Sequence, residues 1–140
     1  MLAPALFVFS SLLPLNARAA PSAQDVTQRE LQRCLDAPSH ASTAGQTQCE
    51  IDAARRYDGR MNAAYTGLMR RLPASICEQL RSAQRAWLAF RTLDAKARAQ
   101  LYETRQGTMF VPMQAAASTA VVRDRALQLE AALRVLEIDG

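Results

Sequence analysis

The chain has 140 residues, of which 49% are hydrophobic and 21% charged, and 17 basic against 13 acidic side chains give a formal net charge of +4. These values describe one ordinary globular domain and exclude a disordered or collagen-like chain. With five glycines, six prolines and one histidine, the chain has little from which to build a turn-rich β-sandwich or a multi-histidine metal site.

The N-terminal segment has the pattern of a secretion signal. Residues 2–15 are apolar, and the A-R-A sequence that ends at Ala19 matches a signal-peptidase cleavage site. The apolar stretch of 14 residues, interrupted by two prolines, is too short to cross about 30 Å of hydrocarbon. We therefore expect a signal peptide over residues 1–19 and no membrane span. The mature single domain, residues 20–140, is expected to be periplasmic or secreted.

A first helix is predicted from about Asp25 to Asp36, with a weak apolar stripe formed by Val26, Leu31, Cys34 and Leu35. Three cysteines in an exported chain predict one disulfide and one leftover thiol. A loop of small and polar residues separates Cys34 from Cys49, so we favour this pair, with pairing of either one to Cys77 as the alternative. The leftover Cys77 is then a free thiol, a link to another chain, or a small buried hydrophobic residue.

The residue types that bind metals or perform catalysis are not grouped in recognisable motifs. No C-x-x-C or H-x-x-H spacing occurs, so we expect no metal site and no other cofactor. His40 lies in a loop beside no obvious cysteine or serine partner, and we interpret it as a loop residue. The chain also lacks G-x-S-x-G, P-loop, G-x-G-x-x-G and H-E-x-x-H motifs, which favours a protein that is not an enzyme.

A second helix is predicted from near Gln46 to Leu72, where Pro73 ends it. Its apolar face has residues at steps of three and four, namely Ala54, Tyr57, Met61, Tyr65, Leu68 and Leu72. Gly59 and Gly67 each weaken the helix propensity by about 1 kcal/mol relative to alanine. We interpret these two glycines as marks of the close approach of a neighbouring helix.

A third helix, from about Ile76 to Arg105, has the clearest pattern. Its seam alternates steps of three and four and consists of Leu80, Ala83, Trp87, Phe90, Asp94, Ala97 and Leu101. Such a seam packs against another helix at a shallow crossing angle. Gly107 then follows the end of the helix, and residues 109–112 are expected to form a short apolar loop.

A fourth helix is predicted over about Met113 to Glu137, with inward-facing Val122, Ala126, Leu129, Leu133 and Leu136. No segment shows the alternating pattern of a strand. We therefore predict an all-α bundle of about four helices, in which the second and third form a long central hairpin. Residues 51–110, which include most of this hairpin, carry a net charge of +6.

The predicted hairpin carries two motifs. Residues 58–68 read D-G-R-M-N-A-A-Y-T-G-L, and residues 83–91 read A-Q-R-A-W-L-A-F-R. Together they resemble the D-x-x-L-N-x-x-Y-x-x-L and A-Q-x-x-W-x-x-x-R-D patterns of the LprI-type lysozyme inhibitor family. Thr92 stands where the family usually has Asp, and the resemblance covers about residues 30–135.

The resemblance extends to the cysteines. Cys34 and Cys49 fall where the first two cysteines of the family are expected, whereas Ala95 and either Ala115 or Ala116 replace its frequent second pair. For function, the resemblance implies inhibition of lysozyme by a protein that binds in the substrate cleft.

The motif residues allow two interpretations. In the first, Trp87 fills the core and the polar side chains hold the second and third helices in register, with Arg91 bonded to Asp58 or Asp94. In the second, the cluster faces a ligand such as a sugar or a peptide. The candidate binding residues under either interpretation are Asp58, Asn62, Tyr65, Gln84, Trp87 and Arg91.

Charge bears on the choice of partner. Lysozymes are commonly basic, so a positively charged inhibitor gains no long-range attraction toward one. A local negative patch for such a partner is expected from Asp25, Glu30, Asp36 and Glu50. The alternative function is a periplasmic envelope adaptor or structural module whose basic hairpin contacts anionic polymers or another protein. Nucleic acid is not an expected partner, because export removes the chain from it.

Overall fold

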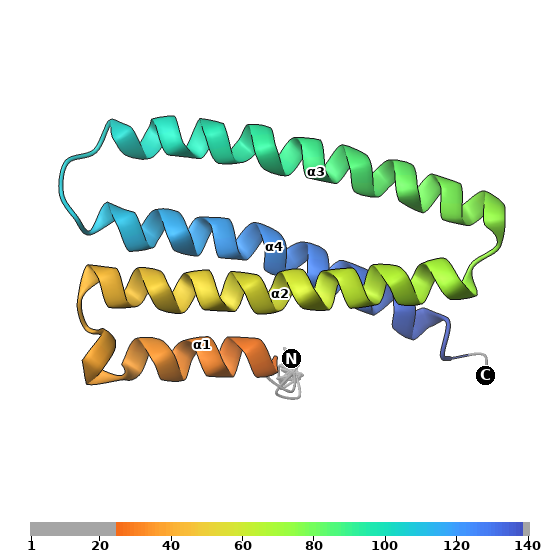
Figure 1. The fold of residues 1–140 in the computed structure, drawn as a ribbon, viewed down its shortest axis with the longest axis horizontal. Helices are drawn as coiled ribbons and strands as arrows, with labels where there is room; N and C mark the ends of the chain where they lie inside the picture. The colour runs from red at the N-terminus through yellow and green to blue at the C-terminus, as the bar shows by residue number, and fades with distance from the viewer. Residues whose placement is uncertain (1–24, 139–140) are drawn as a thin grey trace, which may run out of the picture.

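The computed structural model describes residues 25–138, so the predicted signal peptide over residues 1–19 lies outside the described part. The elements are α1 (Val26–Asp36), a 3-10 turn η1 (Pro38–His40), α2 (Thr43–Arg71), α3 (Ala74–Glu103) and α4 (Phe110–Val135). The all-α prediction is confirmed, and the described range contains no strand. Figure 1 shows α1 beside α2, α4 crossing α2, and α3 at the edge opposite α1.

Two helices, α2 and α4, begin three residues earlier than predicted, and each has a local reason. Ser42 caps α2, since its hydroxyl accepts a hydrogen bond of 3.0 Å from the backbone N–H of Gly45. At α4, Pro112 lies in the first turn, where its missing N–H costs no helical hydrogen bond. The predicted loop over residues 109–112 was therefore wrong for residues 110–112, which are helical.

The main core lies between α2 and α4. Its buried members are Tyr57, Met61, Ala64, Leu68, Val122, Ala126 and Leu129, and Tyr65, Leu72 and Leu133 pack against them. The inward positions predicted for these two helices are mostly confirmed, although Leu136 is exposed. Gly67 marks a close approach, because a Cβ there would lie 3.0 Å from Leu133 Cδ2. The same interpretation of Gly59 is wrong, since a Cβ there would meet nothing within 4 Å.

α3 contributes little to this core, and its predicted seam is only partly correct. Cys77 and Gln84 are its buried residues, while Phe90 and Leu101 are 54% and 56% exposed. Ala83 and Ala97 are exposed as well. The inward face keeps the predicted steps of three and four and includes Leu80, Trp87 and Asp94 of the predicted seam, but its other members are Cys77, Gln84, Arg91 and Arg98. Much of the surface that α3 turns inward is therefore polar.

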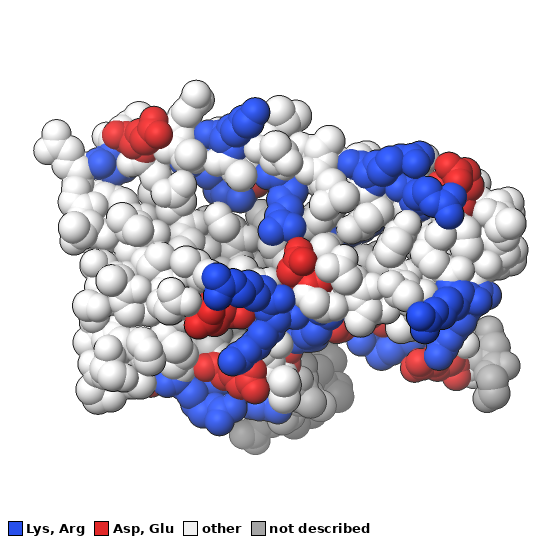
Figure 2. Space-filling model, viewed as in Figure 1, with Lys and Arg blue, Asp and Glu red and all other residues white. Residues whose placement is uncertain are grey.

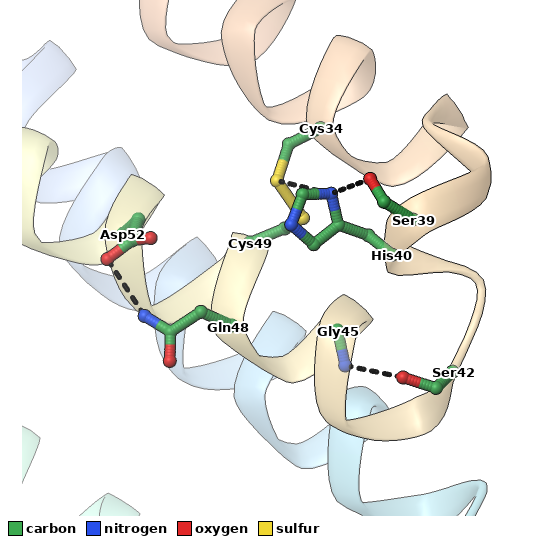
Figure 3. The surroundings of a disulfide bond; sticks show 8 residues. All are labelled: Cys34, Ser39, His40, Ser42, Gly45, Gln48, Cys49 and Asp52. Carbon is green, nitrogen blue, oxygen red and sulfur yellow. Dashed lines mark hydrogen bonds between the residues drawn. A yellow bond between two sulfur atoms is a disulfide. The ribbon is translucent and has the colours of Figure 1, made fainter.

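α1 packs on the N-terminal half of α2 through a small second core of Leu31, Cys49 and Ala53. The favoured disulfide is confirmed, because Cys34 and Cys49 are bonded and tie the end of α1 to α2 (Figure 3). Val26 is 57% exposed and does not belong to the apolar stripe as predicted; Thr27 is buried instead. Among the described residues, no helix is both long and apolar enough to cross a membrane.

Candidate functional site

The two motifs meet where α2 faces α3. Asp58 accepts a hydrogen bond of 3.1 Å from Arg91 Nη1 and another of 3.2 Å from Asn62 Nδ2. The predicted choice between Asp58 and Asp94 as the partner of Arg91 is thus decided for Asp58, while Asp94 pairs with Arg98 on its own helix. The side chains of Arg91 and Asp58 are 38% and 41% exposed, so solvent reaches this ion pair.

Trp87 lies close to two guanidinium groups and is not deep in the core. It is half-buried, with the guanidinium carbons of Arg91 and Arg125 at 5.6 Å and 5.9 Å from its ring centre. A cation over an indole face is attracted by the ring quadrupole. Its ring also packs against the main core, so this one side chain joins the interior to the half-exposed surface.

Gln84 is the motif residue that most clearly has a structural role. It is buried, and its Oε1 accepts two hydrogen bonds, at 3.0 Å and 2.9 Å, from Arg125 on α4. Its Nε2 lies 3.6 Å from the sulfur of Met61 on α2. Gln84 therefore connects all three long helices, whereas Tyr65 only packs against the core.

Arg125 belongs to this cluster, although it lies outside the two sequence motifs. Burial lowers the pKa of its guanidinium, and within residues 25–138 no carboxylate forms an ion pair with it. The only signal in the sequence was its position beside the inward-facing Ala126. Asp58, Arg91 and Arg125 together give the cluster one uncompensated positive charge.

A second polar network, centred on Arg60, was not predicted either. Arg60 donates to both carboxylate oxygens of Glu130 on α4, at 2.7 Å each, and forms an ion pair with Asp25 at the start of α1. Asp25 also accepts a hydrogen bond of 2.6 Å from the buried Tyr57 hydroxyl and caps α1 through the N–H of Thr27. These bonds join α1, α2 and α4.

This network predicts a specific pH dependence of stability. Burial alone would raise the pKa of Asp25, but hydrogen bonds from Tyr57 and Arg60 outweigh it and hold that pKa below its usual value. A carboxyl group with a lowered pKa contributes stability above its unfolded-state pKa of about 3.9, and this stability is lost as the pH falls through the lower folded-state pKa.

Asp25→Asn isolates this effect, because asparagine still caps a helix. We expect the variant to lose about 1–3 kcal/mol of unfolding free energy at pH 7, and the difference from wild type to shrink below about pH 4. Burial raises the pKa of Glu50, which acts in the opposite direction but is common to both proteins. Urea unfolding from pH 7 to pH 2.5 measures the difference; a constant gap would contradict the prediction.

The predicted acidic patch is not a free negative surface. Asp25 is engaged by Arg60, and Glu30 pairs with Arg56. Asp36 accepts a hydrogen bond of 2.8 Å from Gln32, and Glu50 is buried at 7% exposure. Sequence position alone could not reveal that Asp25 and Glu30 face bases on α2 and that Glu50 turns inward, while Asp36 stays exposed on α1.

The basic hairpin is likewise largely neutralised. Most of its cations pair with acids, several of them from α1 or the end of α4. Within residues 51–110 of the described chain, no ion pair is formed by Arg70, Lys96 or Arg105. Figure 2 shows blue and red side chains interleaved on the visible face, and a largely uncharged end on the left.

His40 has a partner, contrary to the interpretation from sequence. Its Nδ1 lies 3.9 Å from Cys34 Sγ and 3.4 Å from Ser39 Oγ, directly over the disulfide (Figure 3). Cys77 is a buried free cysteine whose thiol donates to the carbonyl oxygens of Met69 and Leu72 at 3.4 Å and 3.3 Å. In this structure it is therefore a packed small residue.

Comparison with known proteins gives the family. The family model described as "Lysozyme inhibitor LprI" matches residues 34–129. A crystal structure of an uncharacterized protein from Burkholderia thailandensis has a TM-score of 0.76 and 36% sequence identity to this chain, and the match covers 81% of this chain and 56% of that one. This chain thus spans little more than half the length of that protein. No curated protein matches the chain. Because the family match covers most of the sequence, the chain belongs to the LprI lysozyme inhibitor family.

Proposed function

We propose that this protein is an exported inhibitor that binds lysozyme and blocks its substrate cleft. The observation that carries the proposal is the family match over residues 34–129. Binding rather than catalysis is proposed because the family is one of inhibitors. The signal-like pattern over residues 1–19 supports a periplasmic or secreted location, where cell-wall hydrolases act.

The contact surface we propose is the half-exposed part of the motif cluster, around Arg91 and Trp87. A lysozyme cleft contains two carboxyl groups that act on the sugar chain. A guanidinium is a good partner for a carboxylate, since it donates two parallel hydrogen bonds. Arg91 is 38% exposed, and the neighbouring Trp87 adds an aromatic surface of the kind that anchors interfaces.

The test is the residual activity of a c-type lysozyme titrated with the mature protein, residues 20–140, at two salt concentrations. We expect stoichiometric inhibition that varies little with salt, because the network of ion pairs leaves few unpaired charges for long-range attraction. No inhibition at a large molar excess would contradict the proposed function.

Arg91→Ala tests the contact surface, with Arg70→Ala as the matched control. Arg91→Ala should weaken inhibition about 10–30-fold if Arg91 anchors the interface. It should cost less than about 1 kcal/mol of stability, because its ion pair with Asp58 is solvent-exposed. Arg70, on α2, forms no ion pair among the described residues, and its replacement should change neither quantity. A large loss of stability with unchanged inhibition would favour the register-holding role instead.

The alternative, an envelope adaptor that binds anionic polymers, has weaker support. Its attraction would rest on the unpaired cations Arg70, Lys96 and Arg105, because the rest of the hairpin charge is largely neutralised. Binding of a polyanion that falls steeply with salt, together with the absence of lysozyme inhibition, would favour this alternative.

A further inference from the structure

We propose that Cys34, His40 and Cys49 form a zinc-class metal site when their disulfide is reduced, so that one side-chain cluster alternates between a covalent cross-link and a metal centre. Both sulfurs and one imidazole nitrogen lie within 4.8 Å of one another. Two thiolates with an imidazole are the ligand set that favours Zn²⁺ among common divalent ions.

The geometry needs only a small change. A tetrahedral zinc site with bonds of about 2.0–2.3 Å places its ligand atoms roughly 3.5–3.8 Å apart. The distance from His40 Nδ1 to Cys34 Sγ is already 3.9 Å. The two sulfurs then have to separate, and they sit on different helices, with Cys34 in the last turn of α1 and Cys49 in the second turn of α2.

A close backbone contact at Gly45 determines the position of His40. The 3-10 turn that carries it packs against the first turn of α2 at Gly45, where a Cβ would lie 2.7 Å from His40 Cα and 2.9 Å from its carbonyl oxygen. Any larger residue at position 45 would push the turn away. Gly45 therefore lets the backbone approach closely enough for the imidazole to lie over the sulfurs (Figure 3).

The cluster also has an access path. A surface cavity of about 330 Å³ is lined by both cysteines and by Glu30, Asp52 and Arg56, among others. Water or a carboxylate from this cavity can supply the fourth ligand. The redox step is balanced by a thiol-class reductant: two electrons and two protons convert the disulfide to two thiols, and the reductant becomes a disulfide. Metal binding then releases the two thiol protons to water.

The experiment uses the mature protein, residues 20–140, reduced with a phosphine and titrated with Co²⁺ and then Zn²⁺. We expect one Co²⁺ per chain, with thiolate-to-cobalt charge-transfer absorption and the intense visible bands of four-coordinate cobalt, both abolished by Zn²⁺. Disulfide-bonded protein should show neither signal. Absence of these bands in the reduced protein would overturn the proposal.

Three variants identify the ligands. His40→Ala should weaken binding by more than about tenfold, since even outer-shell partners of a metal contribute 10–100-fold. Cys34→Ser should remove most of the charge-transfer absorption. Cys77→Ser is the matched control and should bind as wild type does, because Cys77 is buried away from the cluster between α2 and α3. Equal affinity in His40→Ala, or a loss in Cys77→Ser, would overturn the assignment.

Circular dichroism on the same samples measures whether the reduced protein and its variants remain helical. If the reduced protein stays helical, the titration stands as described. If it loses helix, Zn²⁺ should restore the helical signal in wild type and in Cys77→Ser but not in His40→Ala, since metal binding is then coupled to folding. Reduced protein that Zn²⁺ neither binds nor refolds would count against the site.

Discussion

Replacing Arg60 by methionine is expected to lower the free energy of unfolding by about 3 kcal/mol. Methionine keeps most of the side-chain volume but leaves Asp25 and Glu130 without their cation, and both carboxylates are mostly buried, at 17% and 22% exposure. Removing one partner from a buried ion pair costs about 3–5 kcal/mol, because the remaining charge is uncompensated. These acids are partly solvated, which places the expectation at the lower end.

Arg56→Met is the matched control, because Arg56 lies one turn earlier on α2 and pairs with a single acid. Its ion pair with Glu30 is exposed, so the expected loss is below about 1 kcal/mol. Urea unfolding at pH 7 measures both variants. Equal losses for the two arginines would show that the network around Arg60 contributes no more than a surface ion pair.

The second large effect is expected from the disulfide. In the Cys34→Ser/Cys49→Ser variant, the cross-link over a sequence separation of 15 residues is lost. Closing a loop of this length contributes about 3 kcal/mol in the chain-entropy model. For a domain of this size, this corresponds to a fall in melting temperature of roughly 10 °C.

Cys77→Ser separates the disulfide from a general effect of losing sulfur. A serine hydroxyl can still donate to the carbonyl oxygens that the Cys77 thiol now contacts, so we expect a loss of less than about 1.5 kcal/mol. Thermal melts in the presence of a chelator, followed by circular dichroism, compare the variants. A double variant that melts within 2 °C of wild type would contradict the prediction.

The sequence predicted best those parts of the fold that rest on apolar periodicity. Tyr57, Met61 and Leu68 on α2 and Val122 and Ala126 on α4 are spaced at helical steps, and all are buried as expected. The Cys34–Cys49 pair followed from the short loop between two helices. In these cases the information lies within one helix or one loop.

α3 shows where periodicity fails. Apolar residues occur around much of this helix, so several seams fit its sequence, and the tertiary contacts choose the one that contains Gln84 and Arg91. That choice depends on partners far along the chain, Arg125 and Asp58. The contact between Arg60 and Glu130 and the position of His40 over the disulfide could not be predicted for the same reason, since neither follows from a local sequence pattern.

The shallow attachment of α3 has a consequence for the dynamics of the molecule. This helix has two buried side chains of its own, Cys77 and Gln84, whereas α2 and α4 supply all the buried members of the main core. Amide hydrogens of α3 are therefore expected to exchange with solvent through a sub-global opening that leaves α1, α2 and α4 folded. Each such opening separates Arg91 from Asp58 and Gln84 from Arg125, so the candidate site assembles and comes apart as one cooperative unit.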